Sequence, residues 1–247
     1  MASGLCRWAV ALLVAGVAAR GQAGGNQGIG SFARAKRELS SIYRDHAVTL
    51  YSGCGYDTRG LIVAQACSFV PRRPDGRGGR IEWEHVVPAA ALGSSLPSWR
   101  LGDPRCVDGR GRRYRGRRCA SKVSAQFRRL EADLYNLVPE IGEVNNMRGN
   151  LPMGEVGPRF TIVAGLDSRM DGGRFEPGAA VKGDVARIHL YMDAAYPELG
   201  LLSDPQRAML RQWSALDPTD AWECLRALRI ARVQGNINSF VTATCDG

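Results

Sequence analysis

The stretch "RIEWEHVVPA", residues 80–89, is an apolar run that an acid and a base interrupt. Its hydrophobic side chains favour burial, whereas Glu84 and His85 are polar neighbours in the middle of the run. On a regular strand, neighbouring side chains point to opposite faces, so this pair can serve one pocket only where the strand ends or bends. Pro88 follows closely and predicts such an end. The plainer alternative is a strand end whose polar pair faces water.

Glu84 and His85 are of the residue types that hydrolytic chemistry uses. A histidine with an unperturbed pKa near 6.5 can act as a neutral base at physiological pH. An adjacent carboxylate can hold a hard cation such as Mg²⁺, and Asn145, directly after "GEV", could add an amide oxygen. Two protein ligands would leave room for water and for a substrate phosphate. From spacing alone, a structural or solvated His85 and a helix-capping Asn145 are the favoured readings.

The N-terminal residues predict an export signal. Arg7 supplies a positive charge, and the apolar run 8–19 that follows is too short to span a bilayer. Small residues then allow cleavage after Ala19 or Ala23, and no cysteine lies there to carry a lipid. We therefore expect a signal peptide over residues 1–23 and one domain over residues 24–247. The mature protein is expected to be periplasmic or secreted, with no membrane segment.

The cysteines agree with export. Seven are encoded, and Cys6 would leave with the signal peptide. The remaining six are Cys54, Cys67, Cys106, Cys119, Cys224 and Cys245. An even number in an exported chain suggests disulfides, and although many pairings are possible, the spacing suggests three disjoint loops: 54–67, 106–119 and 224–245. A zinc site is disfavoured because no C-x-x-C motif occurs.

Positive charge is concentrated in one segment. The chain carries a formal net charge of +9, and residues 100–119 contain arginine at eight positions. These are Arg100, Arg105, Arg110, Arg112, Arg113, Arg115, Arg117 and Arg118. Glycines separate them, so the segment is predicted to be a loop, closed by Cys106 and Cys119. Such a loop can bind phosphates; the alternative is a solvated loop whose charge only maintains solubility.

Hydrophobic periodicity predicts a mostly helical α+β protein with a small β element. We expect helices over residues 32–51, over residues 122–138 and in the C-terminal third, where Ser203 begins a capping box and Asp217 precedes a further helix. Residues 140–154 are expected to form a turn.

Four segments of the chain resemble the bacterial endonuclease I family. They are "EWEHVVPA", "LEADLYNLVPEIGEVNNMRGN", "ARIHLYM" and "RIARVQGNINSF", and the resemblance extends over residues 51–241. Members are exported, non-specific nucleases built around a ββα-metal core related to the HNH motif. The resemblance therefore implies a mostly helical single domain around a small ββα-metal motif.

The same resemblance implies roles for individual residues. Glu84 and Asn145 would be the metal ligands, and His85 would be the general base that activates water. Glu131, in "LEADLYN", matches a further acidic residue of the family's site. An ordinary glutamate on a helix surface is the alternative for Glu131.

In this family, an arginine just before the second loop cysteine contacts the scissile phosphate. Arg115, Arg117 and Arg118 compete for that place, and Arg117 is the expected catalytic residue. Arg112, Arg113, Arg115 and Arg118 are expected to bind the nucleic-acid backbone. The loop is longer and richer in arginine than the family pattern, which leaves the register between these arginines open.

The resulting expectation is an exported, monomeric endonuclease without sequence preference. It would use Mg²⁺, with Mn²⁺ or Ca²⁺ as alternatives, and cut double- and single-stranded DNA, and also RNA, to 5′-phosphate products. Two other hypotheses remain. A non-catalytic basic protein of the periplasm could capture DNA for uptake, and a disulfide-linked structural protein would explain the cysteines alone.

Overall fold

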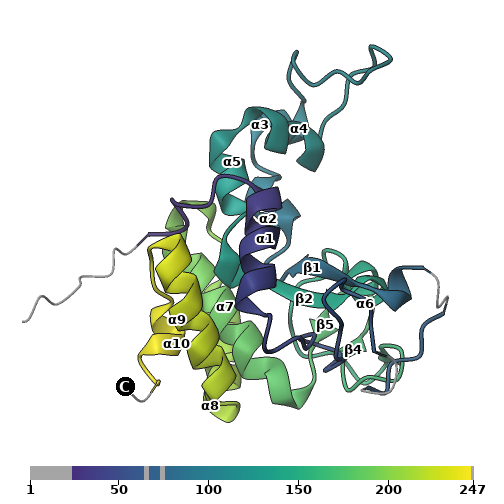
Figure 1. Cartoon of the computed structure of the whole chain (residues 1–247), viewed down its shortest axis with the longest axis vertical. Coiled ribbons are helices and arrows are strands. Elements are labelled where there is room, and N and C mark those ends of the chain that lie inside the picture. Colours follow the sequence, from purple (N-terminus) through teal and green to yellow (C-terminus); the bar gives the residue numbers. More distant parts are fainter. Residues whose placement is uncertain (1–23, 64–66, 73–75, 246–247) are drawn as a thin grey trace, which may run out of the picture.

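The computed structural model describes residues 24–63, 67–72 and 76–245, so the predicted signal peptide lies outside the described residues. Within these residues, helices predominate around two small sheets, as expected for an α+β protein (Figure 1). No helix in the described ranges is both long and apolar enough to cross a membrane.

Two strands and the helix that follows them form the unit that carries Glu84 and His85. Strand β1 (Ile81–His85) pairs antiparallel with β2 (Leu137–Ile141), so that His85 lies opposite Leu137. The strand ends at His85, as Pro88 predicts. Helix α6 (Gly142–Arg148) begins directly after β2 and packs against both strands. The unit has the expected ββα order.

The prediction of a turn over residues 140–154 is wrong, because this segment contains α6. Glycine and asparagine residues give the segment a low intrinsic helix propensity. Tertiary packing overrides that preference: Val144 and Arg148 are fully buried on the side of α6 that faces the strands.

The prediction of a single helix over residues 122–138 is also wrong. Helix α4 (Arg117–Val123) stops before Ser124, whose side chain caps α5 (Ala125–Leu130) by accepting from Phe127 N at 3.1 Å. Asp133 then caps the short 3₁₀ helix η3 (Leu134–Asn136), and the chain enters β2.

Pro139 lies inside β2 rather than ending a helix. Its carbonyl accepts from Leu50 N at 3.0 Å on the side of β2 away from β1. The missing N–H of Pro139 therefore falls outside the β1–β2 ladder, where a strand tolerates proline.

Helix α1 (Phe32–Ile42) is shorter than the predicted 32–51. It begins at Ser31, which accepts from Arg34 N, and buries Ala35, Leu39 and Ile42. Beyond Ile42 the chain turns back, and Val48 forms an isolated bridge with Gly55.

The C-terminal third confirms the predicted helices. They are α7 (Lys182–Ala195), α8 (Asp204–Leu216), α9 (Ala221–Gln234) and α10 (Ser239–Thr242). Ser203 and Gln206 form the expected capping box at α8. The helix expected from Asp217 begins later, because Asp220 is the N-cap that accepts from Glu223 N. In Figure 1, α9 and α10 lie on the side of α7 away from the sheet β1–β2.

The remaining elements are short. The helical ones are η2 (Arg77–Gly79), α2 (Ala89–Gly93), α3 (Pro97–Arg100), η4 (Ala179–Val181) and η5 (Pro197–Leu199). Strands β3 (Thr161–Ile162), β4 (Arg169–Met170) and β5 (Phe175–Glu176) form the second sheet in that order.

Residues 101–116 form an extended loop that we call the arginine arm. With α3 and α4 at its base, it projects from the body of the protein (Figure 1). Two aspartates shape it: Asp103 accepts from Arg105 N at 2.9 Å, and Asp108 accepts from Arg112 N at 2.9 Å. The prediction of a loop is confirmed for residues 101–116, whereas Arg100 lies in α3 and Arg117 and Arg118 lie in α4.

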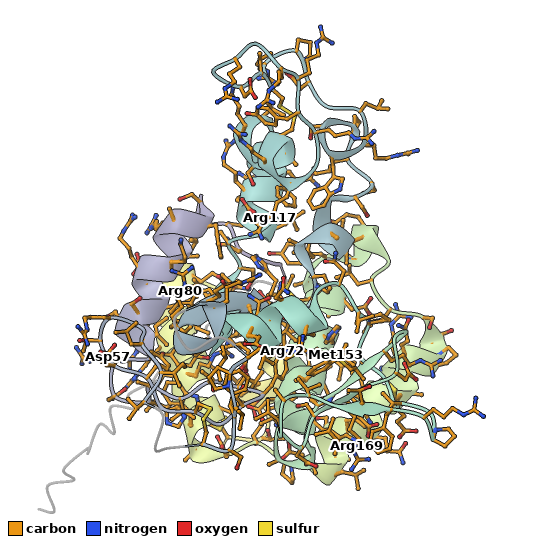
Figure 2. All side chains as sticks on the ribbon, turned by 90° about the vertical axis from the view of Figure 1, so that its right-hand side faces the viewer. Asp57, Arg72, Arg80, Arg117, Met153 and Arg169 are labelled. Atoms are coloured by element: carbon orange, nitrogen blue, oxygen red, sulfur yellow. A yellow bond between two sulfur atoms is a disulfide. The ribbon has the colours of Figure 1, made fainter. Side chains whose placement is uncertain are left out.

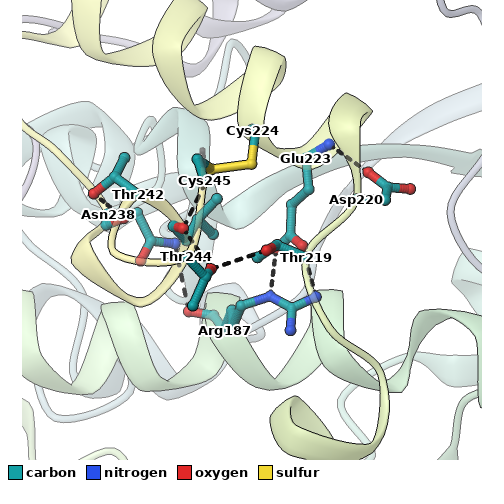
Figure 3. Close-up of a disulfide and its surroundings, with 10 residues drawn as sticks. Arg187, Thr219, Asp220, Glu223, Cys224, Asn238, Thr242, Thr244 and Cys245 are labelled. Atoms are coloured by element: carbon teal, nitrogen blue, oxygen red, sulfur yellow. Dashed lines mark hydrogen bonds and ion pairs between the residues drawn. A yellow bond between two sulfur atoms is a disulfide. The ribbon is translucent and has the colours of Figure 1, made fainter. Parts of the chain in front are cut away.

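The three disulfides join the cysteines in the predicted pairs. Cys54–Cys67 and Cys106–Cys119 each span 13 residues, and Cys224–Cys245 spans 21. Figure 3 shows that Cys224–Cys245 fastens the C-terminal segment to α9 beside the ion pair of Arg187 and Glu223. The second disulfide closes the base of the arginine arm.

Reduction is expected to destabilise the protein strongly. Each disulfide closes a short loop and contributes on the order of 3 kcal/mol to the free energy of unfolding. Purified mature protein, denatured and treated with a thiol reagent, should show no free thiol, and a reductant should lower its Tm. A thiol titre near six together with full activity would contradict the disulfide assignment.

Candidate active site

His85 is held in one tautomer at the end of β1. Its Nε2 lies 2.8 Å from the carbonyl oxygen of Glu131, and the side chain is 6% exposed. A carbonyl oxygen can only accept, so Nε2 carries the hydrogen and Nδ1 keeps its lone pair. Burial, together with the nearby cationic Arg117 and Arg148, lowers the pKa of His85 to about 3. The imidazole is therefore neutral at physiological pH, the form that can accept a proton.

Glu131 links His85 to the arginine-rich segment. Its buried carboxylate accepts from Ser121 Oγ at 2.6 Å and from Arg117 Nε at 3.0 Å. The alternative of a glutamate on a helix surface is wrong, because only 4% of the residue is exposed. Its backbone thus orients His85 while its side chain positions Arg117.

Of the three competing arginines, Arg117 is the one that the structure brings to His85. Its guanidinium lies 5.0 Å from the ring of Phe32, which in turn packs on His85 at 5.1 Å. Arg115 instead extends toward the carbonyl of Arg100 at 3.4 Å. Arg118, in α4, lies over the ring of Tyr114 in the arm at 4.2 Å.

The predicted backbone-binding arginines of the arm and of α4 differ in their partners. Arg112 forms an ion pair with Asp108 at 2.9 Å, which partly neutralises it. Among the described residues, Arg113, Arg115 and Arg118 have no acidic partner within ion-pair distance, and all three are exposed. These three are therefore more available to a phosphate than Arg112.

Glu84 contacts α6, whereas His85, the last residue of β1, contacts Glu131 and Phe32. Its Oε1 accepts from Arg148 Nη1 at 2.9 Å, and both side chains are buried. Arg148 also donates to the backbone carbonyls of His85 (2.9 Å) and Val86, so it ties the end of β1 to α6. Burial raises the pKa of Glu84 to about 7, although Arg148 opposes this shift.

Asn145 lies one turn before Arg148 on the same side of α6. Its Nδ2 donates to Glu82 Oε2 at 3.1 Å, and Arg77 pairs with the same carboxylate, with Nε to Oε1 at 2.8 Å. Because a carboxylate oxygen only accepts, the amide nitrogen of Asn145 must face Glu82. Its Oδ1 therefore points away from Glu82.

The predicted metal ligands consequently lie on facing elements. Glu82 and Glu84 share one face of β1, and their partners Asn145 and Arg148 share one face of α6. Asn145 Oδ1 and Glu84 Oε2 accept no hydrogen bond from any described residue, which leaves two oxygens for a cation.

These oxygens fit a hard cation. Carboxylate and amide oxygens suit Mg²⁺, which retains several waters. A positive ion beside Glu84 would also favour the charged form that burial disfavours. Nowhere in the described ranges do three or more His, Cys, Asp or Glu side chains gather in a metal-binding group, so a cation here would depend on the pair Glu84 and Asn145.

A basic cavity of about 1160 Å³ borders the site. Phe32 and Arg117 form its end nearest His85, and Trp83 and Asn145 also line it. In Figure 2, Arg117, Arg80 and Asp57, which all line this cavity, follow one another across the face of the molecule.

Sequence reasoning missed four residues of this site: Phe32, Glu82, Ser121 and Arg148 as the partner of Glu84. The alternation "IEWEH" contains a signal for Glu82, since residues two apart share a strand face. Arg148 lies in the segment that resembles endonuclease I. Nothing in the sequence indicates that Phe32 or Ser121 meets residues so distant in the chain.

A strand–strand–helix unit that holds a neutral imidazole and a carboxylate beside a basic cavity is the arrangement expected of a ββα-metal nuclease. The family model for Endonuclease I matches residues 32–245, and the chain belongs to this family. It is therefore a nuclease.

Two curated deoxyribonucleases match nearly the whole chain, and a ribonuclease matches less than half of it. An extracellular deoxyribonuclease of Aeromonas hydrophila is 35% identical, covering 88% of this chain and 90% of that protein. A periplasmic deoxyribonuclease of the same species is 35% identical over 87% of the chain and 86% of its own length. An extracellular ribonuclease of Bacillus subtilis (strain 168) is 33% identical over 44% of the chain and 43% of its own length.

Proposed function

We propose that this protein is an exported, Mg²⁺-dependent endonuclease that hydrolyses DNA, and also RNA, without sequence preference and leaves 5′-phosphate ends. The observation that carries the proposal is His85, whose Nε2 is engaged by the Glu131 carbonyl and whose Nδ1 has no hydrogen-bond partner among the described residues. The names of the relatives support DNA as substrate, and the ribonuclease supports RNA.

Each residue has a chemical task in this proposal. His85 Nδ1 accepts a proton from the attacking water, and Glu131 holds the imidazole and Arg117 in place. Arg117 donates to the scissile phosphate, whose charge increases in the transition state. Glu84 and Asn145 would hold the cation, which would supply positive charge to offset charge on the phosphate and on the leaving 3′ oxygen.

Export is part of the proposal. The relatives named extracellular and periplasmic support cleavage of a signal peptide within residues 1–23 and release into an oxidising compartment. Disulfides persist in such compartments, which agrees with the three found here.

Digestion of supercoiled plasmid with and without a chelator tests the proposal. We expect nicking and linearisation with Mg²⁺ and none with excess chelator. A protein that shifts plasmid in a gel but leaves it intact under both conditions would be the non-catalytic capture protein. A protein that neither binds nor cuts would be structural.

Metal affinity is expected to depend on Glu82 as well as on the two ligands. Glu84→Ala and Asn145→Ala each remove one ligand. Glu82→Ala frees the Asn145 amide to rotate, and loss of such an outer partner typically weakens metal binding about 10- to 100-fold. Titration calorimetry of Mg²⁺ or Mn²⁺ on a His85→Ala background measures this without turnover.

The matched control is Glu82→Gln, whose amide oxygen can still accept from Asn145. It should retain most of the metal affinity that Glu82→Ala loses. Equal affinities of the parent, Glu82→Ala and Asn145→Ala proteins would show that Asn145 is not a ligand.

A further inference from the structure

The cavity beside Arg117 continues well beyond the catalytic residues. Helix α1 forms one wall, the turn at residues 56–61 and helix η2 form another, and β1 contributes Ile81 to Trp83. Arg117 and Asn145 in this lining belong to the catalytic proposal, whereas the residues from α1, the turn and η2 have no part in it.

The lining is strongly basic. It contains six cationic side chains and two carboxylates, those of Asp57 and Glu82. Each carboxylate already has an arginine partner: Arg59 with Asp57 at 3.0 Å, and Arg77 with Glu82. The cationic side chains are Lys36, Arg44, Arg59, Arg77, Arg80 and Arg117.

Three of these cations remain without an anionic partner. Lys36, Arg44 and Arg80 are exposed, and none lies within 4.0 Å of a carboxylate in the part of the chain that the structure describes. Excess charge in a concave site attracts a polyanion and releases its counterions.

Aromatic side chains line the same cavity as these cations. Phe32, Tyr56 and Trp83 line it and are partly exposed. Tyr43 packs edge to face against Trp83, with their ring centroids 5.6 Å apart. Cationic side chains interspersed with aromatic faces are typical of surfaces that bind single-stranded nucleic acid, because unpaired bases stack on the rings while phosphates meet the cations.

We propose that this cavity binds a single-stranded segment of nucleic acid next to the scissile phosphate, with phosphates on Lys36, Arg44 and Arg80 and bases against Tyr56 and Trp83. The proposal rests on the proposed nuclease function, because Arg117 and Phe32 join the cavity to His85. A duplex keeps its bases stacked on one another, so it cannot use these aromatic walls. The cavity at the arginine arm is smaller, about 270 Å³, and Tyr114 is the aromatic residue that lines it, so the arm is left to contact duplex backbone.

The test measures binding without cleavage. His85→Ala protein in chelator is titrated with a fluorescein-labelled oligothymidylate and with a duplex of equal length, at several salt concentrations. The cavity variant changes Lys36, Arg44 and Arg80 to glutamine. The matched control changes Arg159, Arg211 and Arg232, which are exposed and lie outside the cavity, to glutamine.

The cavity variant should bind the single strand at least about 10-fold more weakly near 0.1 M salt. Its plot of log K against log salt should flatten by about 2 units, since each phosphate contact on a single strand contributes about 0.7. The control should retain affinity and slope for the single strand. Changing Arg110, Arg113 and Arg115 to glutamine should instead weaken the duplex more than the single strand.

A further variant examines stacking separately from charge. Tyr56→Leu removes one aromatic wall with little change in volume and none in charge, so it should weaken single-strand binding about 5-fold or more without changing the salt slope. Circular dichroism of this variant should match the parent.

An unchanged affinity and slope of the cavity variant for the single strand would overturn the proposal, as would equal losses for duplex and single strand. Plasmid digestion by the unmodified protein reports separately on the nuclease function. If the unmodified protein cleaves plasmid but the cavity variant binds the single strand as the parent does, this inference alone is wrong. If the unmodified protein does not cleave plasmid, the proposed function is wrong.

Discussion

Replacing His85 with alanine is expected to lower the rate of plasmid cleavage by about 10²- to 10⁴-fold, the usual effect of losing a general base. The structure gives this expectation its physical reason. Nε2 is engaged by the Glu131 carbonyl, so Nδ1 is the free acceptor, and burial keeps the ring neutral. No other imidazole in the described residues contacts Glu131 or Phe32.

DNA binding should survive this substitution, because many phosphate contacts contribute to affinity. Single-turnover cleavage and gel-shift binding measure the two effects independently. His46→Gln is the matched control, since His46 stacks on Trp222 at 4.0 Å, away from the site. If His85→Ala cuts plasmid at the parental rate, His85 has no part in the mechanism.

Replacing Arg148 with alanine is expected to lower the free energy of unfolding by about 3–5 kcal/mol. The substitution leaves the buried Glu84 without its cationic partner and removes donors from the carbonyls of His85 and Val86. It should also lower kcat of the fraction that remains folded, because Arg148 positions the end of β1. Urea denaturation and active-site-normalised kinetics measure these effects.

A second buried ion pair provides the control. Arg187 and Glu223 are also buried, with Nη2 2.6 Å from Oε2, but they join α7 to α9 away from β1. Arg187→Ala should destabilise the protein comparably and leave kcat per folded molecule unchanged. The double change Glu84→Gln with Arg148→Met should recover stability but not activity. Full activity of Arg148→Ala would show that catalysis does not require Arg148 to position the end of β1.

The parts that could be predicted depend on local patterns. The capping box at Ser203 places α8 correctly, because the cap and its partner lie three residues apart. The disulfide pairs follow from spacing because each closes a short, separate loop. The C-terminal end of α1 was predicted wrongly. The segment 122–138 was also predicted wrongly, since periodicity continues through the turns that Ser124 and Asp133 cap.

By itself, the sequence determined the family, the class of fold, the cysteine pairs and the acid and base at the end of β1. Only the tertiary structure decided which groups meet them. The residues His85 and Glu131 are 46 positions apart, and Glu84 and Arg148 are 64 apart. That Arg117, and not Arg115 or Arg118, pairs with Glu131 likewise depends on the direction in which α4 leaves the arm. Contacts at such separations depend on how β1, β2 and α6 pack, and burial then sets the charge state of each group.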